Sequence, residues 1–292
     1  MPERDGYIPG VPCWVDTSQP EPEAAIAFYR ELFGWEFEDA MPPGSAVHYW
    51  IARLRGGDVA AVTSIPEGAP RLAAWNTYVW VESADATAAS VREAGGTVVE
   101  EPFDVLTAGR MAVCADPEDA VFRLWQPGEH RGARIVNEHG SLTFNDLRTR
   151  DADRAAAFYG AVFGWERLDL PSGSFWALPE YGDYLEQLTP GIKRMTAEFG
   201  VPGFENVVAA ISPLTEGDGE AGWGVTFATD DADATAARAA ELGGEVLEAP
   251  ADAPFTRTTL LRDPQGTTFR ASKFVPENKD LVASPGSSAA SA

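Results

Sequence analysis

Two pairs of charged residues recur along the chain and could carry acid–base chemistry. Asp16 and Asp146 lie 130 residues apart, and Arg123 and Arg270 lie 147 residues apart. A carboxyl group inside an apolar pocket can act as a general acid or base, because desolvation raises its pKa. An arginine beside it can stabilise negative charge on a ligand oxygen. The rival interpretation is structural, an Asp–Arg ion pair or a hydrogen bond to a turn amide, and the sequence leaves both open.

Other reactive residues are sparse. The chain has three histidines (His48, His130 and His139) and two cysteines, Cys13 and Cys114. Two distant cysteines do not indicate a disulfide framework, and buried free cysteines usually behave as small hydrophobic residues. We find no GxSxG motif, Walker loop or dinucleotide fingerprint following a predicted strand.

The charged pairs belong to an internal repeat. Residues 12–35 and 142–165 align without a gap, and both contain the sequence Phe-Tyr followed by Phe-Gly-Trp. Residues 83–89 match 231–237, and both Gly-Gly (95–96, 243–244) and Asp-Pro (116–117, 263–264) also recur. The repeat predicts two domains, 10–128 and 140–275, joined by a linker, 129–139. Residues 1–9 are an N-terminal extension, and the small, polar residues 276–292 predict a disordered tail.

Each half is predicted to contain two β-α-β-β-β units. Apolar residues in 23–33 follow helical spacing, and Gly34 and Gly164 are placed to cap such helices in the left-handed conformation. Ser83 and Asp231 are suitable N-caps for second helices that end at Gly95 and Gly243. Strands are expected at 47–53, 77–81, 110–114, 120–125, 223–228, 256–261 and 267–273. The fold class is therefore α+β.

This combination of motifs resembles the vicinal oxygen chelate superfamily, which includes glyoxalases, bleomycin-resistance proteins and extradiol dioxygenases. The motifs concerned are Phe-Tyr with Phe-Gly-Trp, Ala-Asp-Ala-Thr with Gly-Gly, and the Asp-Pro turn before a final strand. The resemblance covers about nine-tenths of the chain and implies two tandem domains of paired βαβββ modules. Each domain would be an open β-cup flanked by helices and wrapped around a small-molecule cavity.

The resemblance also implies where metal ligands would stand in metal-using members. The first-strand positions fall on Trp14, Asn76, Phe144 and Gly224, the last-strand positions on Arg123 and Arg270, and the others within 59–61 and 207–210. Most of these side chains cannot bind a divalent cation, which needs about three anionic or imidazole ligands. We therefore expect no metal and no cofactor. The alternative is a displaced site using Asp16, Asp146, Glu205 or His48.

If the implied ligand positions face the cup interior, strand alternation places other side chains there too. Asp16, Asp146, Arg123 and Arg270 are the expected catalytic residues. The expected ligand-binding residues are Trp14, Trp50, Asn76, Tyr78, Trp125, Phe144, Trp176, Arg110 and Arg257. The aromatic residues could form a stacking platform for a flat ligand, and ordinary core packing is the competing interpretation.

The composition limits the partners. The formal net charge is −23, which argues against nucleic acid and against an anionic membrane surface. There is no apolar run long enough to span a membrane, and the first residues do not resemble a secretion signal. We expect a cytoplasmic monomer or loose homodimer whose partner is a small organic ligand.

The second half carries about 20 extra residues near 182–206. Pro190 could open a short helix ending at Gly200. This insertion is either a lid over the second cup or a contact with another domain or a second chain.

The leading functional hypothesis is a metal-independent lyase, isomerase or cyclase acting on an organic substrate of natural-product type. A non-catalytic protein that sequesters a toxic compound, as bleomycin-resistance relatives do, is the first alternative. A metal-dependent glyoxalase or dioxygenase is the second.

Overall fold

The computed structural model describes residues 3–65, 73–170, 172–215 and 219–281. Its first half contains two βαβββ modules. The first comprises β1 (Pro12–Gln19), α1 (Pro22–Phe33), β2 (Glu36–Asp39), β3 (Tyr49–Leu54) and β4 (Gly57–Ser64). The second comprises β5 (Ala74–Trp80), α2 (Ala84–Glu93), β6 (Thr97–Val105), β7 (Gly109–Ala115) and β8 (Val121–Pro127).

The second half repeats this order and adds an insertion. Its third module comprises β9 (Leu142–Thr149), α3 (Ala152–Phe163), β10 (Glu166–Leu170), β11 (Gly173–Ala177) and β12 (Val207–Pro213). Between β11 and β12 lie α4 (Tyr181–Leu188), α5 (Ile192–Glu198) and the 3-10 helix η1 (Phe204–Asn206). The fourth module comprises β13 (Gly222–Ala228), α6 (Ala232–Glu241), β14 (Glu245–Ala253), β15 (Thr256–Arg262) and β16 (Thr268–Phe274), followed by η2 (Pro276–Asp280).

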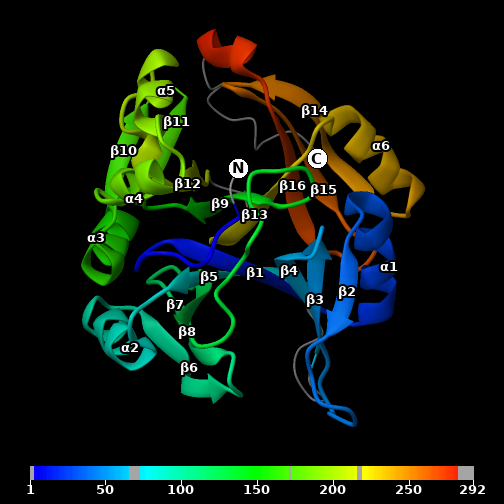
Figure 1. Cartoon of the computed structure of the whole chain (residues 1–292). Coiled ribbons are helices and arrows are strands. Elements are labelled where there is room, and N and C mark those ends of the chain that lie inside the picture. The colour runs from blue at the N-terminus through cyan, green and yellow to red at the C-terminus, as the bar shows by residue number, and fades with distance from the viewer. Residues whose placement is uncertain (1–2, 66–72, 171, 216–218, 282–292) are drawn as a thin grey trace.

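Each half forms one eight-stranded mixed sheet. The strand orders are β2-β3-β4-β1-β5-β8-β7-β6 and β10-β11-β12-β9-β13-β16-β15-β14. In both sheets the first strands of two modules pair antiparallel at the centre, and the other strands extend to either side. The predicted α+β fold of paired βαβββ modules is confirmed (Figure 1).

The local signals of the sequence explain these elements. Gly34 and Gly164 both have φ of 73° and end α1 and α3 with left-handed caps, a conformation that glycine adopts without a steric cost. The side chains of Ser83 and Asp231 accept hydrogen bonds from the backbone N–H of Ala86 and Ala234 and start α2 and α6.

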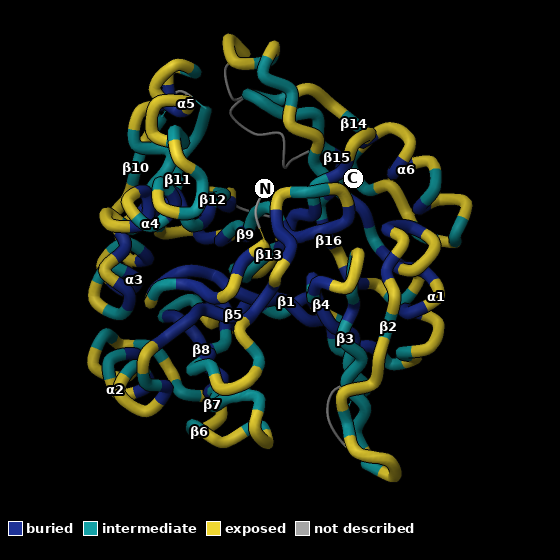
Figure 2. Tube along the Cα trace, in the orientation of Figure 1, coloured by how far each residue is buried: buried dark blue, intermediate teal, exposed yellow. Residues whose placement is uncertain are grey.

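The two halves share their hydrophobic cores. Helix α1 packs beside α6 of the other half, and α2 packs beside α3 (Figure 1). One core joins side chains of α1 to side chains of β13, β16 and α6, and a second joins α2, β7 and β8 to α3 and β11. The buried trace accordingly runs through the middle of the molecule, across both sheets (Figure 2).

Reciprocal hydrogen bonds cross this interface. The Tyr29 hydroxyl of α1 donates to Asp263 Oδ2 of the opposite half, and the Tyr159 hydroxyl of α3 donates to Asp116 Oδ2, both at 3.0 Å. Both acceptors belong to the repeated Asp-Pro turns. Each turn is therefore fixed by the helix of the other half.

The extra segments of the chain are ordered where the structure describes them. The insertion forms three short helices, and α5 lies within the stretch where Pro190 and Gly200 predicted one helix. Residues 276–280 were predicted to belong to a disordered tail, but they form η2 because Asn278 bonds to Asp252 and to the carbonyl of Thr256. The remainder of that predicted tail, 282–292, lies outside the described residues.

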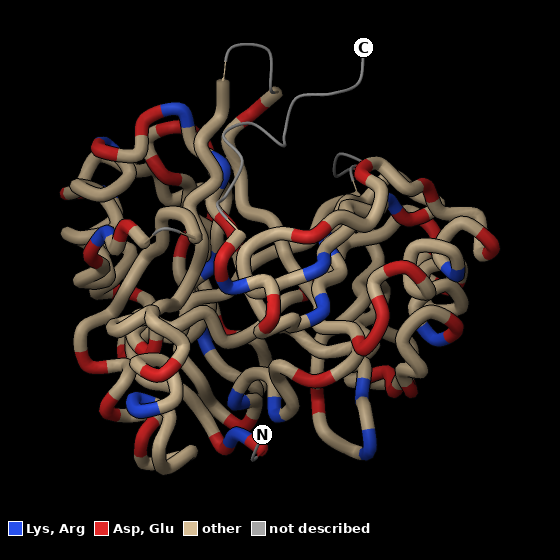
Figure 3. The backbone as a smooth tube through the Cα atoms, turned by 90° about the horizontal axis from the view of Figure 1, so that it is seen from above, with Lys and Arg blue, Asp and Glu red and all other residues tan. Residues whose placement is uncertain are grey.

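Acidic residues outnumber basic ones and are spread over the exposed surface of both halves (Figure 3). Among the described residues, none of the helices has both the length and the apolar character needed to cross a membrane.

Candidate functional site

The second cup contains a large cavity. Its volume is about 1050 Å³, which is enough for a ligand of drug size. Residues of β9, β12, β13 and β16 form its floor, and residues of β11, the insertion and the β14–β15 hairpin form its walls. Phe144, Asp146 and Arg270, three of the residues expected to face a cup interior, line it.

Asp146 stands on the cavity floor. It lies directly opposite Gly224 in the β9–β13 pairing, and a Cβ atom at that glycine would lie 2.6 Å from Asp146 Oδ1. The Ser212 hydroxyl of the neighbouring β12 is 3.5 Å from Asp146 Oδ2. The side chain is partly exposed and lines the cavity, and the protein around it replaces enough water to raise the pKa of Asp146, while the charges of Arg270 and Arg148 and the Ser212 bond partly oppose that rise.

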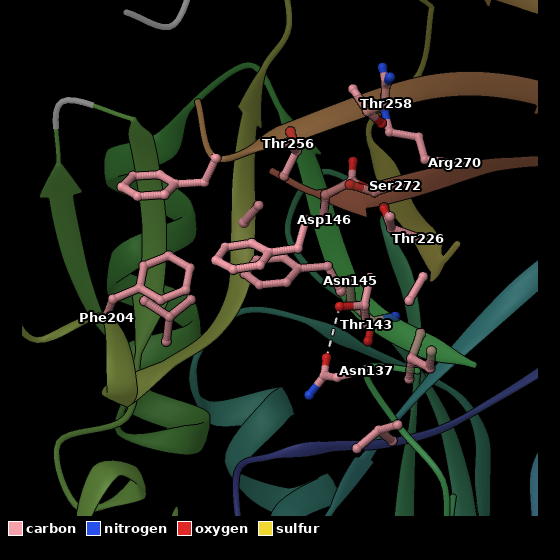
Figure 4. Close-up of a pocket in the computed structure, with 18 of the residues that line it drawn as sticks. Asn137, Thr143, Asn145, Asp146, Phe204, Thr226, Thr256, Thr258, Arg270 and Ser272 are labelled. Carbon is pink, nitrogen blue, oxygen red and sulfur yellow. Dashed lines mark hydrogen bonds between the residues drawn. The ribbon is translucent and has the colours of Figure 1, made fainter. Parts of the chain in front are cut away.

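Arg270 faces the same cavity from β16 but is engaged by a different carboxylate. Its guanidinium donates to both oxygens of Glu248 in β14, at 2.7 and 3.1 Å. The Asp146–Arg270 ion pair of the structural interpretation is not formed, since Arg270 pairs with Glu248 instead. The hydroxyl groups of Thr226, Thr258 and Ser272 lie on neighbouring strands near Asp146 and Arg270 (Figure 4).

Aromatic rings line the opposite wall. Phe144 and Phe204 are nearly parallel, with an interplanar angle of 22° and ring centroids 6.3 Å apart. Phe175 meets both rings edge-on, at 76° to Phe144 and 82° to Phe204. Phe204 belongs to the insertion and projects toward the floor strands (Figure 4). These rings provide flat apolar surfaces next to the polar floor.

The insertion also reaches across the outer edge of the cavity. Phe199, just after α5, has its ring centroid 6.3 Å from that of Phe255 in the β14–β15 turn and 6.0 Å from that of Phe274 in β16. All three residues line the cavity. This aromatic contact joins the two walls of the cavity.

The first cup is filled by its own side chains. Asp16 accepts hydrogen bonds from the side chains of Asn76, Tyr49 and Tyr78, which occupy its acceptor positions. The guanidinium of Arg123 lies over the ring of Tyr78, 5.4 Å from its centroid, and bonds to no described carboxylate. Asp16 therefore forms neither the ion pair with Arg123 nor the hydrogen bond to a turn amide that the structural interpretation offered. Its partners are three side chains of the same cup.

The linker completes the filling. His130 packs edge-on against Trp14, with ring centroids 4.4 Å apart, and its carbonyl oxygen accepts a hydrogen bond from Trp125 Nε1 at 3.0 Å. Burial lowers the pKa of His130, opposed in part by the charges of Asp58 and Asp16. Tyr7 and Val136 belong to the same buried cluster as Trp14. His130 of the linker thus fills part of the first cup, while Tyr7 and Val136 lie between this cluster and the cavity of the second cup, which they also line.

Residue size explains why one cup is filled and the other open. The strand registers are equivalent, so each inward residue of the first cup has a counterpart in the second. The counterparts are Asn76 and Gly224, Tyr78 and Thr226, Trp80 and Ala228, and Trp125 and Ser272. In every one of these pairs the second cup has the smaller side chain, which leaves its floor free.

Four predicted ligand-binding residues lie outside both cup interiors. Trp50 packs against the core around α1, and Trp176 is fully buried in the core around α3. Arg110 and Arg257 form surface ion pairs, with Asp85 and Asp104 and with Asp233 and Asp252 respectively. Side chains alternate along a strand, and in each case the neighbouring residue points inward. Trp14, Asn76, Tyr78 and Trp125 do face a cup interior, but it is the filled one.

The positions where the resemblance implies metal ligands do not suit a metal in the second cup. Phe144, Gly224 and Arg270 occupy three of them, and Ala210 is the residue of β12 that lies beside Asp146. None offers a side-chain oxygen or nitrogen that binds a cation. Across the described residues, no three His, Cys, Asp or Glu side chains are grouped as a metal site would require.

Several residues of this site were missed by the sequence interpretation. Phe175, Phe204, Ser212 and Glu248 line the cavity. Strand alternation from Ala177 back to Phe175 could have identified the first, and the insertion's aromatic residues could have suggested the second. Glu248 lies in a strand interrupted by irregular pairing with β15, so simple alternation could not place it.

The chain matches two family models. Residues 141–270 match the Glyoxalase/Bleomycin resistance protein/Dioxygenase superfamily, and residues 14–125 match a Glyoxalase-like domain. CFP32 of Mycobacterium tuberculosis, provisionally named a glyoxylase, is 39% identical over 95% of this chain and 100% of its own length. The anthracycline biosynthesis protein DnrV of Streptomyces peucetius is 34% identical over 90% of this chain and 93% of its own length.

Solved structures share the fold at low sequence identity. The Mn(II)-bound glyoxalase from Novosphingobium aromaticivorans is 16% identical, with a TM-score of 0.58 over 91% of this chain and 83% of that chain. The 2,2',3-trihydroxybiphenyl 1,2-dioxygenase of Sphingomonas wittichii strain RW1 is also 16% identical, with a TM-score of 0.56 over 91% of each chain. The matched models, the full-length relatives and the repeated βαβββ architecture together establish that this chain belongs to the glyoxalase/bleomycin resistance/dioxygenase superfamily.

Proposed function

We propose that the second cup binds a flat, oxygenated organic molecule and catalyses a metal-independent proton transfer on it, as a lyase, isomerase or cyclase. The observation that carries this proposal is a partly buried carboxyl group, Asp146, on the floor of a large aromatic-walled cavity, where desolvation raises its pKa. The naming of the relative DnrV for anthracycline biosynthesis supports a polycyclic aromatic substrate of natural-product type.

The proposed chemistry uses residues at the floor of the cavity. Asp146 removes a proton from a carbon next to a substrate carbonyl, and the resulting enolate oxygen is stabilised by the guanidinium of Arg270. Returning the proton to another atom completes an isomerisation. Alternatively, the enolate carbon attacks a second carbonyl of the substrate, and the alkoxide that forms takes the proton back from Asp146, which completes a cyclisation. A raised pKa suits Asp146 to this cycle because it must both accept and return the proton.

Metal independence is part of the proposal. It rests on the side chains at the implied ligand positions, where Phe144, Gly224 and Arg270 cannot coordinate a cation. Elemental analysis of the purified protein tests it directly. A metal that stays bound in stoichiometric amount through dialysis would contradict the proposal and favour glyoxalase or dioxygenase chemistry.

Incubation with hydroxyanthraquinones and their partly reduced, carbonyl-containing precursors tests the function, with products identified by mass spectrometry. We expect product from the wild-type protein and none from Asp146→Asn, with binding measured by calorimetry retained. Asp16→Asn is the matched control, because that carboxylate lies in the filled cup. Turnover that survives Asp146→Asn would refute the assigned role.

Sequestration without chemistry is the second candidate function. The aromatic wall and the Phe199 contact that bridges the cavity would serve a binding protein equally well. Tight binding with every ligand recovered chemically unchanged would favour it over catalysis.

A further inference from the structure

A buried arginine from the N-terminal extension lines the cavity without a carboxylate partner. Arg4 is only 5% exposed and is among the residues that line the second cup. Within the described part of the chain, no Asp or Glu oxygen lies within ion-pair distance of its guanidinium. A buried charge without a counterion is costly and normally has a partner.

The groups around Arg4 only partly compensate its charge. Its guanidinium lies over the rings of Tyr7 and Tyr181, 5.1 and 5.9 Å from their centroids. Nη1 donates one hydrogen bond, to the Tyr181 hydroxyl at 3.0 Å. A guanidinium has five N–H donors, so most of its hydrogen-bonding capacity is not used by the described residues.

Tyr181 supplies a second donor at the same place. Its oxygen accepts the bond from Arg4, and none of the hydrogen bonds among the described residues uses its own proton. The neighbouring tyrosines differ, since Tyr7 donates to the carbonyl of Ala133 and Tyr184 to the carbonyl of Gly6. Arg4 and Tyr181 therefore place a cation and an adjacent O–H donor on the cavity surface.

The segments that carry these two residues hold them in place. Arg4 N–H donates to the carbonyl of Arg134 in the linker, at 2.8 Å. The Tyr184 bond to Gly6 ties α4 to the extension. The extension and the insertion both lie outside the βαβββ repeat, and each contributes one of the two donors.

Three carboxylates that line the cavity are paired with arginines. Glu248 binds Arg270, Asp252 binds Arg257, and Glu138 binds Arg55. Each of these carboxylates has a cation other than Arg4, and two of the five N–H donors of Arg270 are used by Glu248. Lys273 also lines the cavity but is exposed to solvent, so Arg4 is the buried cation of the lining that has no carboxylate partner among the described residues.

We propose that Arg4 and Tyr181 form a subsite for the carboxylate of a ligand whose aromatic body occupies the second cup. A carboxylate could accept from the guanidinium and from the Tyr181 hydroxyl at once, which gives charge-assisted hydrogen bonds in a buried site. This inference rests on the proposed use of the cavity for a flat organic ligand and names the polar group by which that ligand is recognised.

The test compares 2-naphthoate with the uncharged 2-naphthamide by isothermal titration calorimetry on the full-length protein at neutral pH. We expect the wild-type protein to bind the carboxylate about tenfold more tightly than the amide, because a hydrogen bond to a charged group is worth that much. In Arg4→Gln this preference should disappear while amide binding stays unchanged. Arg134→Gln is the matched control, because that residue pairs with Glu3 in the same region and is about half exposed.

Tyr181→Phe gives a second variant in case Arg4→Gln does not fold, and it should reduce the preference severalfold. Equal binding of both probes by the wild-type protein would overturn the carboxylate subsite and leave the proposed function standing. So would a preference that persists in Arg4→Gln and is lost in Arg270→Gln. Failure of both probes to bind would overturn the subsite together with the proposed aromatic ligand.

Discussion

The geometry around Asp146 depends on a glycine, and replacing that glycine by alanine should disturb the site selectively. A Cβ atom at Gly224 would lie 2.6 Å from Asp146 Oδ1 and 3.0 Å from Asp146 Cγ. The first distance is about 0.8 Å short of the 3.4 Å at which ordinary contact begins. The backbone of Gly224 is not in the left-handed region, so alanine is acceptable there apart from this contact.

The carboxyl group must therefore move to accommodate the methyl group. Because β9 lies between β13 and β12, the methyl group pushes the carboxyl group toward Ser212 of β12, which is already 3.5 Å from Oδ2, so the space left for it is on the cavity side. Forcing one extra methyl group into a packed site typically costs about 1–3 kcal/mol. We expect Gly224→Ala to lower the free energy of unfolding by about this amount and to weaken ligand binding, because the carboxyl group would occupy part of the ligand's space.

Urea unfolding of a double-mutant cycle provides the assay. In an Asp146→Ala background the carboxyl group that would clash with the new methyl group is absent. Gly224→Ala should then leave the free energy of unfolding nearly unchanged. Gly222→Ala is the control in the same strand, since a Cβ there meets no atom within 4 Å. An equal cost for both glycine substitutions, or a cost at Gly224 that persists without the Asp146 carboxyl, would refute the reasoning.

Three further predictions follow from the same contacts. Asp146→Asn should stabilise the protein relative to the wild type at neutral pH and lose this advantage at acidic pH. The pKa of Asp146 is higher in the folded than in the unfolded wild-type protein, so the folded state binds more protons and the wild type loses stability as pH rises. Urea unfolding at several pH values checks this, and a constant difference in the free energy of unfolding would contradict it. Tyr78→Phe should cost about 1–3 kcal/mol by removing a donor to buried Asp16, with calorimetric ligand affinity unchanged, and a loss of affinity would place the ligand in the first cup instead. Phe199→Ala should speed ligand release in stopped-flow experiments without a large change in unfolding midpoint, and an unchanged release rate would rule out closure by this residue.

The sequence predicted most of the architecture because the repeat is strong and its signals are local. The caps at Gly34 and Gly164 and the N-caps at Ser83 and Asp231 depend only on neighbouring residues. Alternation along β9 and β16 also placed Asp146 and Arg270 facing a cup interior.

Whether each cup is open or filled by side chains could not be predicted in the same way. Whether Asp16 is free depends on Tyr49 and Tyr78, which reach it from other strands. The filling of the first cup further depends on His130, in a linker without regular structure to guide its placement. Trp50 and Trp176 were expected in the cups from strand alternation, but both strands present them to the helix-covered face, where an aromatic side chain packs equally well.

The crossed tyrosine bonds have a consequence for how the chain folds. Tyr29 and Tyr159 each belong to a core shared by both halves and each fix a turn in the opposite half. One half therefore contains a complete sequence repeat but lacks part of the contacts that it needs to fold. Thermal unfolding should therefore be one cooperative transition, with each half losing its structure when the other does. Two separately produced halves should be poorly folded alone and should recover structure on mixing, so that fragment complementation restores the interface that the single chain contains.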